Sequence, residues 1–219
     1  MSNPHALDIA QDPEELLEVM HPPPSSSSSL SPPLSFDPPT STGKCAYRGI
    51  VHRDGLWHNT SHVWLIDAHS SSLLLQKRSM HKDTFPGRWD ISSAGHVESS
   101  SASIKHTAMS ELAEELGLDD VSEDELKLAF IVPAEQTSIG GCNAYEHVHF
   151  LVMRDDYGGA KKNFSLRTAE VSEVRWTNAW DVIDALRSGD VGYAPRTPSY
   201  VDVMEGELVK IIGPRRSGT

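Results

Sequence analysis

Apolar positions along the chain alternate with turn residues in a way that predicts strands on both sides of helices. Runs at 62–66 and 73–76, joined by a turn at 67–71, predict a β-hairpin. Further strands are expected at 128–132, 147–153 and 171–176. Strands that precede and follow helices, with hairpin spacing in places, predict an α/β sandwich around a mixed sheet.

Helical spacing is clearest over residues 102–116. The apolar residues Ile104, Ala108, Leu112 and Leu116 repeat every four positions, and Gly117 follows as the expected C′ residue that ends the helix. A closing amphipathic helix is expected at 179–186. The stretch 85–90, which contains a Pro-Gly pair, is expected to be a loop.

The composition divides the chain into three parts. Residues 1–43 contain no Lys or Arg and include a Pro/Ser run, so we expect a disordered acidic tail with at most a short helix at 13–20. Residues 44–205 have the texture of one globular domain. Residues 206–219 are expected to be a short C-terminal tail.

The formal net charge of −12 argues against nucleic acid and anionic membranes as partners, because both need a basic surface. No apolar run reaches the ~18 residues of a membrane span, and the amino terminus lacks the apolar core of a signal peptide. Cys45 and Cys142 have no metal-ligand spacing and suggest no disulfide framework. A cytoplasmic protein is therefore predicted.

Three carboxylates gather on the predicted helix before Gly117. Glu111, Glu114 and Glu115 project into a common arc, because residues three and four apart share a helix face. Like charges four apart cost a helix roughly 0.2–0.5 kcal/mol, which a hard cation such as Mg²⁺ between them would remove. A solvated acidic face explains the same spacing, and the spacing alone does not separate the two.

These motifs together resemble the Nudix hydrolases. The family signature is Gly, five residues, Glu, seven residues, then Arg-Glu-hydrophobic-x-Glu-Glu-x-Gly-hydrophobic, and its two ends match Gly95 and the run 111–118. The stretch 82–96 is similar to the branch that contains the isopentenyl-diphosphate isomerases and their related hydrolases, and 170–176 resembles its closing strand. The likeness covers about residues 46–190 and implies a Nudix-type α/β/α sandwich.

The chain departs from the signature at several positions. Ser101 stands where the first glutamate is expected, the second half begins one residue late, and Ser110 replaces the arginine that holds a catalytic carboxylate in the family. Glu98 is a candidate to replace the missing glutamate. The isomerases have a cysteine where this chain has Ala94, so the resemblance favours hydrolysis over isomerisation.

The resemblance implies a metal-dependent hydrolase. Its metal ligands would be Glu111, Glu114 and Glu115, with Glu114 and Glu115 the stronger pair, binding Mg²⁺ or, as a substitute, Mn²⁺. Glu114 and Glu115 would be catalytic together with Glu146, which is placed like a glutamate used in this branch. Glu135 is a weaker candidate for the base, and Glu146 is equally open to a plain surface role.

Candidate substrate-binding groups surround Gly95. Basic residues near these positions face the phosphates in the isomerase-like branch, and Trp89 could form a stacking wall or belong to the core. His58 and His96 fall where the isomerases have metal-binding histidines, although ordinary loop histidines are the simpler reading. The predicted substrate-binding residues are Arg78, Lys82, Trp89, Gly95 and His96.

The leading function is a Mg²⁺-dependent hydrolase that cleaves the phosphoanhydride of a small organic or nucleoside diphosphate, isoprenoid diphosphates included. The alternative is a non-catalytic Nudix-like module that binds a diphosphate or a protein, supported by Ser101 and Ser110. A relative of the isomerases is a weaker third option. The expected partner is the small-molecule diphosphate, and a homodimer, common in the superfamily, is left open.

Overall fold

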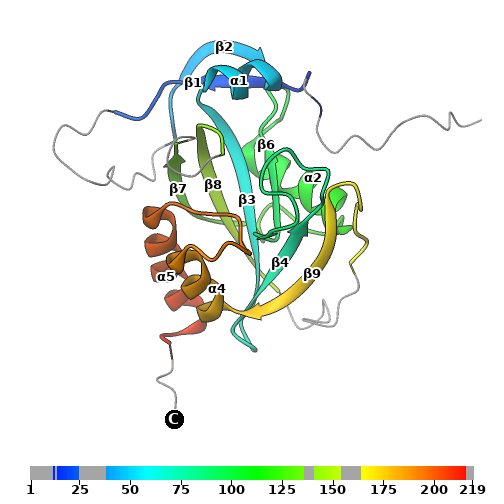
Figure 1. Cartoon of the computed structure of the whole chain (residues 1–219), viewed down its shortest axis with the longest axis vertical. Helices are drawn as coiled ribbons and strands as arrows, with labels where there is room; N and C mark the ends of the chain where they lie inside the picture. The colour runs from blue at the N-terminus through cyan, green and yellow to red at the C-terminus, as the bar shows by residue number, and fades with distance from the viewer. Residues whose placement is uncertain (1–11, 13, 25–37, 136–140, 154–163, 216–219) are drawn as a thin grey trace, which may run out of the picture.

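The structure is a computed structural model that describes residues 12, 14–24, 38–135, 141–153 and 164–215 (Figure 1). Within these residues, a seven-stranded mixed sheet forms the centre of the molecule. Strands β5, β4, β3, β8 and β7 follow one another across it, while β6 pairs with β3 and β9 pairs with β4. The strands are β3 (His58–Asp67), β4 (Ser72–Arg78), β5 (Trp89–Asp90), β6 (Ser93–His96), β7 (Lys127–Ala134), β8 (Ala144–Val152) and β9 (Val171–Asn178).

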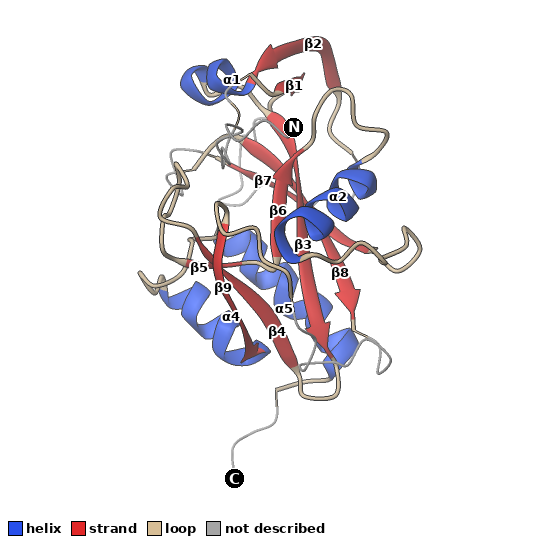
Figure 2. Cartoon of the chain, turned by 90° about the vertical axis from the view of Figure 1, so that its right-hand side faces the viewer, coloured by secondary structure: helices blue, strands red, loops and turns tan. Residues whose placement is uncertain are grey.

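Helices cover both faces of this sheet (Figure 2). Helix α2 (Ile104–Leu116) packs on one face, and α4 (Ala179–Ser188) and α5 (Pro198–Ile212) pack on the other. Among the strands of the described residues, β3 and β8 pair in parallel, whereas the hairpin β3–β4 and the other ladders of this sheet are antiparallel. The predicted α/β sandwich around a mixed sheet is confirmed.

Alternation along β3 explains why the core has two halves. Successive side chains of a strand point to opposite faces, so Val63 and Leu65 pack under α2, and Trp64 and Ile66 pack under α4 and α5. On the second face, the indole N–H of Trp64 donates to the hydroxyl of Tyr200 in α5 at 2.9 Å. The strand is thereby fixed between the two helical layers.

Helix α2 begins and ends where its capping residues dictate. The side chain of Ser103 accepts from the backbone N–H of His106 at 3.0 Å, so the helix starts at Ile104, two residues later than predicted. At the other end Gly117 has a φ of 68°, a left-handed conformation that favours glycine, as predicted. The carboxylates before Gly117 therefore lie in the last two turns of an ordered helix.

The N-terminal segment differs from the expected tail. Strand β1 (Leu16–Met20) pairs antiparallel with β2 (Ser41–Tyr47), and α1 (Arg48–Asp54) follows. The short helix expected at 13–20 is wrong, and disorder does not describe β1, because Leu17 and Met20 are buried. The partners of β1 lie far along the chain, at β2 and at Ser99, whose N–H donates to the carbonyl of Leu16. Much of the Pro/Ser run lies outside the described residues.

The C-terminal boundary at 205/206 is also wrong. Helix α5 continues to Ile212, and Met204 and Leu208 are fully buried against the sheet. The expected loop at 85–90 ends in the short strand β5, which pairs with Gln76 and Lys77 of β4. No helix in the described ranges is long and apolar enough to cross a membrane.

Candidate active site

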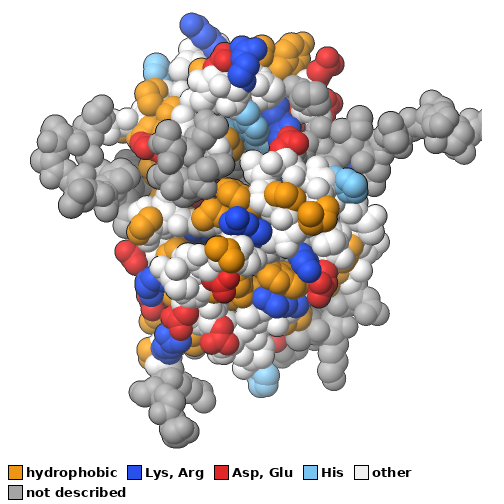
Figure 3. All heavy atoms as spheres, viewed as in Figure 1, with side chains coloured by type: hydrophobic (Ala, Val, Ile, Leu, Met, Phe, Trp, Pro, Cys, Tyr) orange, Lys and Arg blue, Asp and Glu red, His pale blue; other side chains and the backbone are white. Residues whose placement is uncertain are grey.

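A cavity of about 570 Å³ opens at the end of the sheet beneath β1 and α1. Strands β3, β6 and β8 and helix α2 contribute to its wall, together with the loops around 82–85, 167–170 and 196 and the N-terminal residues 12 and 14–16. Figure 3 shows histidine, basic and acidic side chains close together on this face, below α1. The site therefore combines anionic and cationic side chains from segments far apart in sequence.

Glu111 lies directly against Gly95. A Cβ atom added to Gly95 would stand 1.9 Å from the Glu111 Oε1 atom and 2.2 Å from its Cδ atom. Gly95 is therefore needed for close approach, because any side chain would occupy the space of this carboxylate. Burial and the neighbouring Glu115 raise the pKa of Glu111 well above its usual range.

Glu115 is more deeply enclosed than Glu111. Its Oε2 atom accepts from the hydroxyl of Ser93 at 2.7 Å, from the N–H of Ala94 at 3.1 Å and from the amide of Gln76 at 3.3 Å. Its buried Oε1 atom has no hydrogen-bond partner. Burial raises the pKa of Glu115 to about 7, although the Lys82 ammonium opposes the shift.

Glu114 and Glu170 form the acidic rim of the same cavity. Arg167 bridges them, with Nη1 at 3.0 Å from Glu114 Oε2 and 3.0 Å from Glu170 Oε1. Lys82 Nζ lies 2.5 Å from Glu170 Oε2 and 3.9 Å from Glu115 Oε1. The three predicted carboxylates thus line or back one cavity, but Glu114 is the exposed member and Glu115 the buried one.

Of the predicted substrate-binding residues Arg78 and Trp89, the first lines the cavity and the second does not. Arg78 lines the cavity, but its guanidinium donates to the Thr84 carbonyl and hydroxyl and to Asp90. Trp89 is not among the lining residues; the Arg175 guanidinium stacks 3.9 Å from its ring centroid. The structure therefore places Trp89 away from the cavity lining, partly buried against the core cluster under α4 and α5.

Glu146, the predicted base, lines the cavity from β8 and is buried. Burial raises its pKa to about 7, against the stabilising charge of Arg196. The Glu146 Oε1 atom lies 3.8 Å from His62 Nε2. The Glu146 Oε2 atom is buried and has no hydrogen-bond partner. The alternative, Glu135, is an exposed residue outside the cavity lining.

Three histidines and a cysteine meet on one wall. His52 of α1, His58 of β3, His96 of β6 and Cys142 before β8 each offer one ligand atom, and these atoms all lie within 4.8 Å of one another. Burial lowers the pKa of His58 and His96 well below the usual histidine range and lowers that of His52. His58 and His96, which fall where the isomerases have metal-binding histidines, thus lie together with two further donors.

Several residues of the site were missed by sequence reasoning. The N-terminal segment supplies Glu15 although its composition suggested disorder, and Arg167 and Glu170 come from a loop before β9. Arg196 precedes α5, and its ion pair with Asp90 is invisible in the sequence. Two of the missed residues had a sequence signal: His52 lies six residues before His58, and Glu170 opens the run 170–176 that resembles the closing strand of the branch. The missed residues are Glu15, Arg48, His52, Arg167, Glu170 and Arg196.

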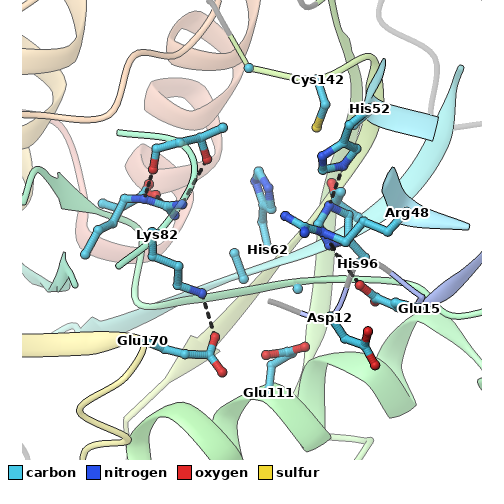
Figure 4. Close-up of a pocket in the computed structure, with 18 of the residues that line it drawn as sticks. Asp12, Glu15, Arg48, His52, His62, Lys82, His96, Glu111, Cys142 and Glu170 are labelled. Carbon is cyan, nitrogen blue, oxygen red and sulfur yellow. Dashed lines mark hydrogen bonds and ion pairs between the residues drawn. The ribbon is translucent and has the colours of Figure 1, made fainter. Parts of the chain in front are cut away.

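The carboxylates of α2 fit a divalent cation with oxygen ligands. Buried carboxylates with raised pKa values lie side by side, and the Glu115 Oε1 atom is buried without a hydrogen-bond partner. Gly95 leaves space for Glu111 where a side chain would otherwise stand. Figure 4 shows Glu111 at the base of the cavity, between Lys82 and Glu170 on one side and Glu15, Arg48 and His96 on the other.

The chain is similar to known proteins in sequence and in fold. The family model described as NUDIX domain matches residues 57–198. The chain is 35% identical over 157 residues to Nudix hydrolase 3 of Arabidopsis thaliana. This alignment covers 70% of the chain and 20% of the Arabidopsis protein. It is 27% identical over 160 residues to the isopentenyl-diphosphate Δ-isomerase of Dictyostelium discoideum. That alignment covers 67% of the chain and 65% of the isomerase.

A solved structure supports the fold assignment. The crystal structure of DR0079 from Deinococcus radiodurans matches with a TM-score of 0.55 at 16% identity, covering 87% of this chain and 98% of that one. At this identity the likeness concerns the fold alone. The chain spans only a fifth of the Arabidopsis relative's length, so the activity of that whole protein does not transfer directly.

Proposed function

The chain belongs to the NUDIX domain family, and from this premise we propose that it hydrolyses the phosphoanhydride bond of a small organic or nucleoside diphosphate with the help of a divalent cation. The arrangement that carries the proposal is the contact of Gly95 with Glu111, beside the buried carboxylate of Glu115. It supports a cation site at the floor of a cavity that also contains basic side chains.

Glu111 and Glu115 would hold the cation, with Glu114 contributing from the rim. Mg²⁺ and Mn²⁺ prefer oxygen ligands, and either would neutralise phosphate charge and lower the pKa of water when bound there. The hydrogen bonds to Glu115 Oε2 from Ser93, Ala94 and Gln76 would keep its other oxygen pointed at the cation.

Arg167 compensates for the departure at Ser110. The family arginine holds a catalytic carboxylate, and here Arg167 pairs with Glu114 at 3.0 Å from a different part of the chain. Its side chain also contacts Glu170, so one guanidinium orders two carboxylates at the rim. This contact supports an active site in spite of the degenerate signature.

Glu146 would act as general base. Its carboxylate is buried in the cavity wall, and a pKa of about 7 suits proton transfer near neutral pH. Lys82, Arg48 and Arg196 would supply positive charge to the diphosphate, since each lines the cavity. Ala94 provides no thiol for protonating an alkene, which favours hydrolysis over isomerisation.

A substrate panel with metal titration tests this function. The full chain is assayed with prenyl, nucleoside and sugar diphosphates in Mg²⁺, Mn²⁺ or chelator, and the organic monophosphate released is quantified. We expect cation-dependent release that Glu115→Gln abolishes and the surface variant Glu173→Gln retains. Ligand-induced thermal stabilisation without product formation would instead identify a binding module.

A further inference from the structure

The loop between β4 and β5 holds an aromatic residue in an unusual backbone conformation beside the cavity. Phe85 has a φ of 50°, in the left-handed region that a bulky residue rarely adopts. The residue is half-buried and lines the cavity. Figure 4 shows Lys82, from the same loop, reaching toward Glu170 at the cavity. Residues held in such conformations cluster at binding sites, which suggests a function for Phe85.

Arg78 fixes the chain immediately before Phe85. Its Nε atom donates to the Thr84 carbonyl at 2.8 Å, and its Nη2 atom donates to the Thr84 hydroxyl at 3.0 Å. Its Nη1 atom donates to the buried carboxylate of Asp90 at 3.0 Å, which keeps the guanidinium in this orientation. Each guanidinium nitrogen therefore has an acceptor inside the protein. Arg78 acts on the loop rather than on the phosphates, where the family resemblance placed it.

A tight turn fixes the chain immediately after Phe85. The backbone N–H of Arg88 donates to the Phe85 carbonyl at 3.3 Å, which closes a four-residue turn around Pro86 and Gly87. Gly87 has a φ of 72°, and a proline followed by a left-handed glycine is typical of a type II turn. The Arg88 guanidinium lies 5.5 Å from the centroid of the Phe85 ring, within reach of a cation–π contact. The backbone and the ring of Phe85 are thus both held in place.

The lining around Phe85 is mostly polar. Among the described residues that line the cavity, Leu16 and Phe85 are the larger apolar side chains, and no Trp or Tyr is present. Acidic, basic, histidine and threonine side chains make up most of the remainder. An isoprenoid chain needs apolar walls on several sides, because burying polar groups against it is unfavourable. A planar ring with polar edges needs one stacking surface and hydrogen-bonding groups around it, which this lining contains.

We propose that Phe85 is a specificity-determining residue that stacks on a planar, polar-edged ring carried by the diphosphate, and that Arg78 is the residue that positions it. The inference rests on the proposed function and deepens it, because it selects against isoprenoid diphosphates and assigns Arg78 to the loop. The hydrogen bonds from Arg78 to Thr84 and the turn at 86–87 maintain the strained backbone of Phe85. A ring fixed before the substrate arrives lowers the entropy cost of binding.

Calorimetric binding of non-hydrolysable analogues to the full chain tests the stacking. The probes, all with Mg²⁺, are nucleoside methylene diphosphates, a dimethylallyl methylene diphosphate and inorganic methylene diphosphonate. Lost stacking on a base costs about 5–150-fold in affinity, so Phe85→Leu should bind the nucleoside analogues at least about fivefold more weakly, while Phe85→Tyr binds as the wild type does. All variants should bind the inorganic analogue equally.

Met80→Ala is the matched control, because Met80 lies in the same loop, is 74% exposed and is outside the cavity lining. It should bind every analogue with wild-type affinity. Two results would overturn the role of Phe85. One is a wild type that binds the nucleoside analogues no more tightly than the dimethylallyl analogue, and the other is Phe85→Leu that binds them as tightly as the wild type.

A variant that keeps the charge of Arg78 tests its positioning role. Arg78→Lys retains a cation but lacks the planar fork that reaches both oxygen atoms of Thr84. It should weaken the nucleoside analogues about as much as Phe85→Leu, leave the inorganic analogue unchanged, and add no further loss when combined with Phe85→Leu. Thr84→Val, which leaves Arg78 and Asp90 in place, should show a smaller loss of the same kind. An equal loss for the inorganic analogue in Arg78→Lys would identify a phosphate ligand and refute the positioning role.

Cleavage assays separate this inference from the proposed hydrolysis. Cation-dependent cleavage of prenyl and nucleoside diphosphates with equal kcat/KM, in both the wild type and Phe85→Leu, would refute the inference while the hydrolase function stands. Phe85-dependent binding of the nucleoside analogues without cleavage of any diphosphate would refute the hydrolase function and support Phe85 as the recognition residue.

Discussion

Replacing Gly95 with alanine should displace the Glu111 carboxylate while leaving the fold intact. The new Cβ would stand 1.9 Å from Glu111 Oε1, and an ordinary contact needs 3.4 Å, so the carboxylate must retreat by about 1.5 Å. The carboxylate is the end of a flexible side chain, so it yields more readily than the backbone. The cost should therefore fall on the cation site rather than on folding.

A displacement of this size has a predictable effect on rate. A misplacement of about 1 Å in a catalytic arrangement can cost about 100-fold, so kcat/KM of Gly95→Ala should fall about 100-fold or more. That loss corresponds to about 2.7 kcal/mol of transition-state stabilisation. Steady-state assays with the best substrate of the panel, at several Mg²⁺ concentrations, measure it, and part of the loss should be recovered at high Mg²⁺.

Gly206→Ala provides the matched control. Gly206 lies in α5, and an added Cβ would meet nothing within 4 Å. Activity should be unchanged, and stability should rise by up to about 1 kcal/mol, because alanine is the better helix former. If Gly95→Ala kept wild-type kcat/KM while unfolding at the same urea concentration, the assignment of Glu111 as a cation ligand would be refuted.

Three further predictions follow from burial and charge. Glu146 must be ionised to accept a proton and its pKa is about 7, so kcat/KM of the wild type should rise about tenfold per pH unit below pH 7. Glu146→Gln should lose this pH dependence. A wild-type kcat/KM that does not change with pH below 7 would exclude Glu146 as the base. Lys82→Met breaks a buried ion pair and should cost about 3–5 kcal/mol in urea unfolding, against about 1 kcal/mol or less for Lys77→Met on the surface. Equal losses would show that the Lys82 pair is effectively solvated. Leu208→Ala should cost about 2–5 kcal/mol and Val209→Ala about 0.5 kcal/mol, because only Leu208 is fully buried; a negligible cost for Leu208 would restore the boundary at residue 205.

The central sheet and its helices could be predicted because their signals are local. The hairpin β3–β4 has two apolar runs and a short turn, and α2 has a four-residue apolar repeat closed by Gly117. Each of these features depends on a few neighbouring residues. The carboxylates of α2 were found for the same reason, since helical spacing places them on one face.

The N-terminal strand β1 could not be predicted, because its pairing depends on partners distant in sequence. Strand β1 gains its hydrogen bonds from β2, more than twenty residues later in the chain, and from the segment after β6. The surrounding residues 1–43 have the composition of a disordered tail, so the composition predicted disorder where the structure has a strand. Glu15 reaches the cavity only because of this pairing.

The division of roles among the carboxylates could not be predicted either. Helical spacing does not show that Ser93 and Gln76 enclose Glu115, nor that Arg167 draws Glu114 to the rim. Likewise, Trp89 lies in the stretch that leads to Gly95, yet it packs against the core cluster under α4 and α5, and Arg175 stacks on its ring. Such outcomes depend on which face of a short strand is turned toward the cavity.

Titration of the protein with Mn²⁺, followed by electron paramagnetic resonance of the free ion, tests the central claim most directly. In the presence of a non-hydrolysable methylene diphosphate, the wild type and Glu173→Gln should bind Mn²⁺ equally. Glu111→Gln and Glu115→Gln should each weaken this binding at least about tenfold. Equal Mn²⁺ affinity in all four proteins would contradict a cation site on the carboxylates of α2.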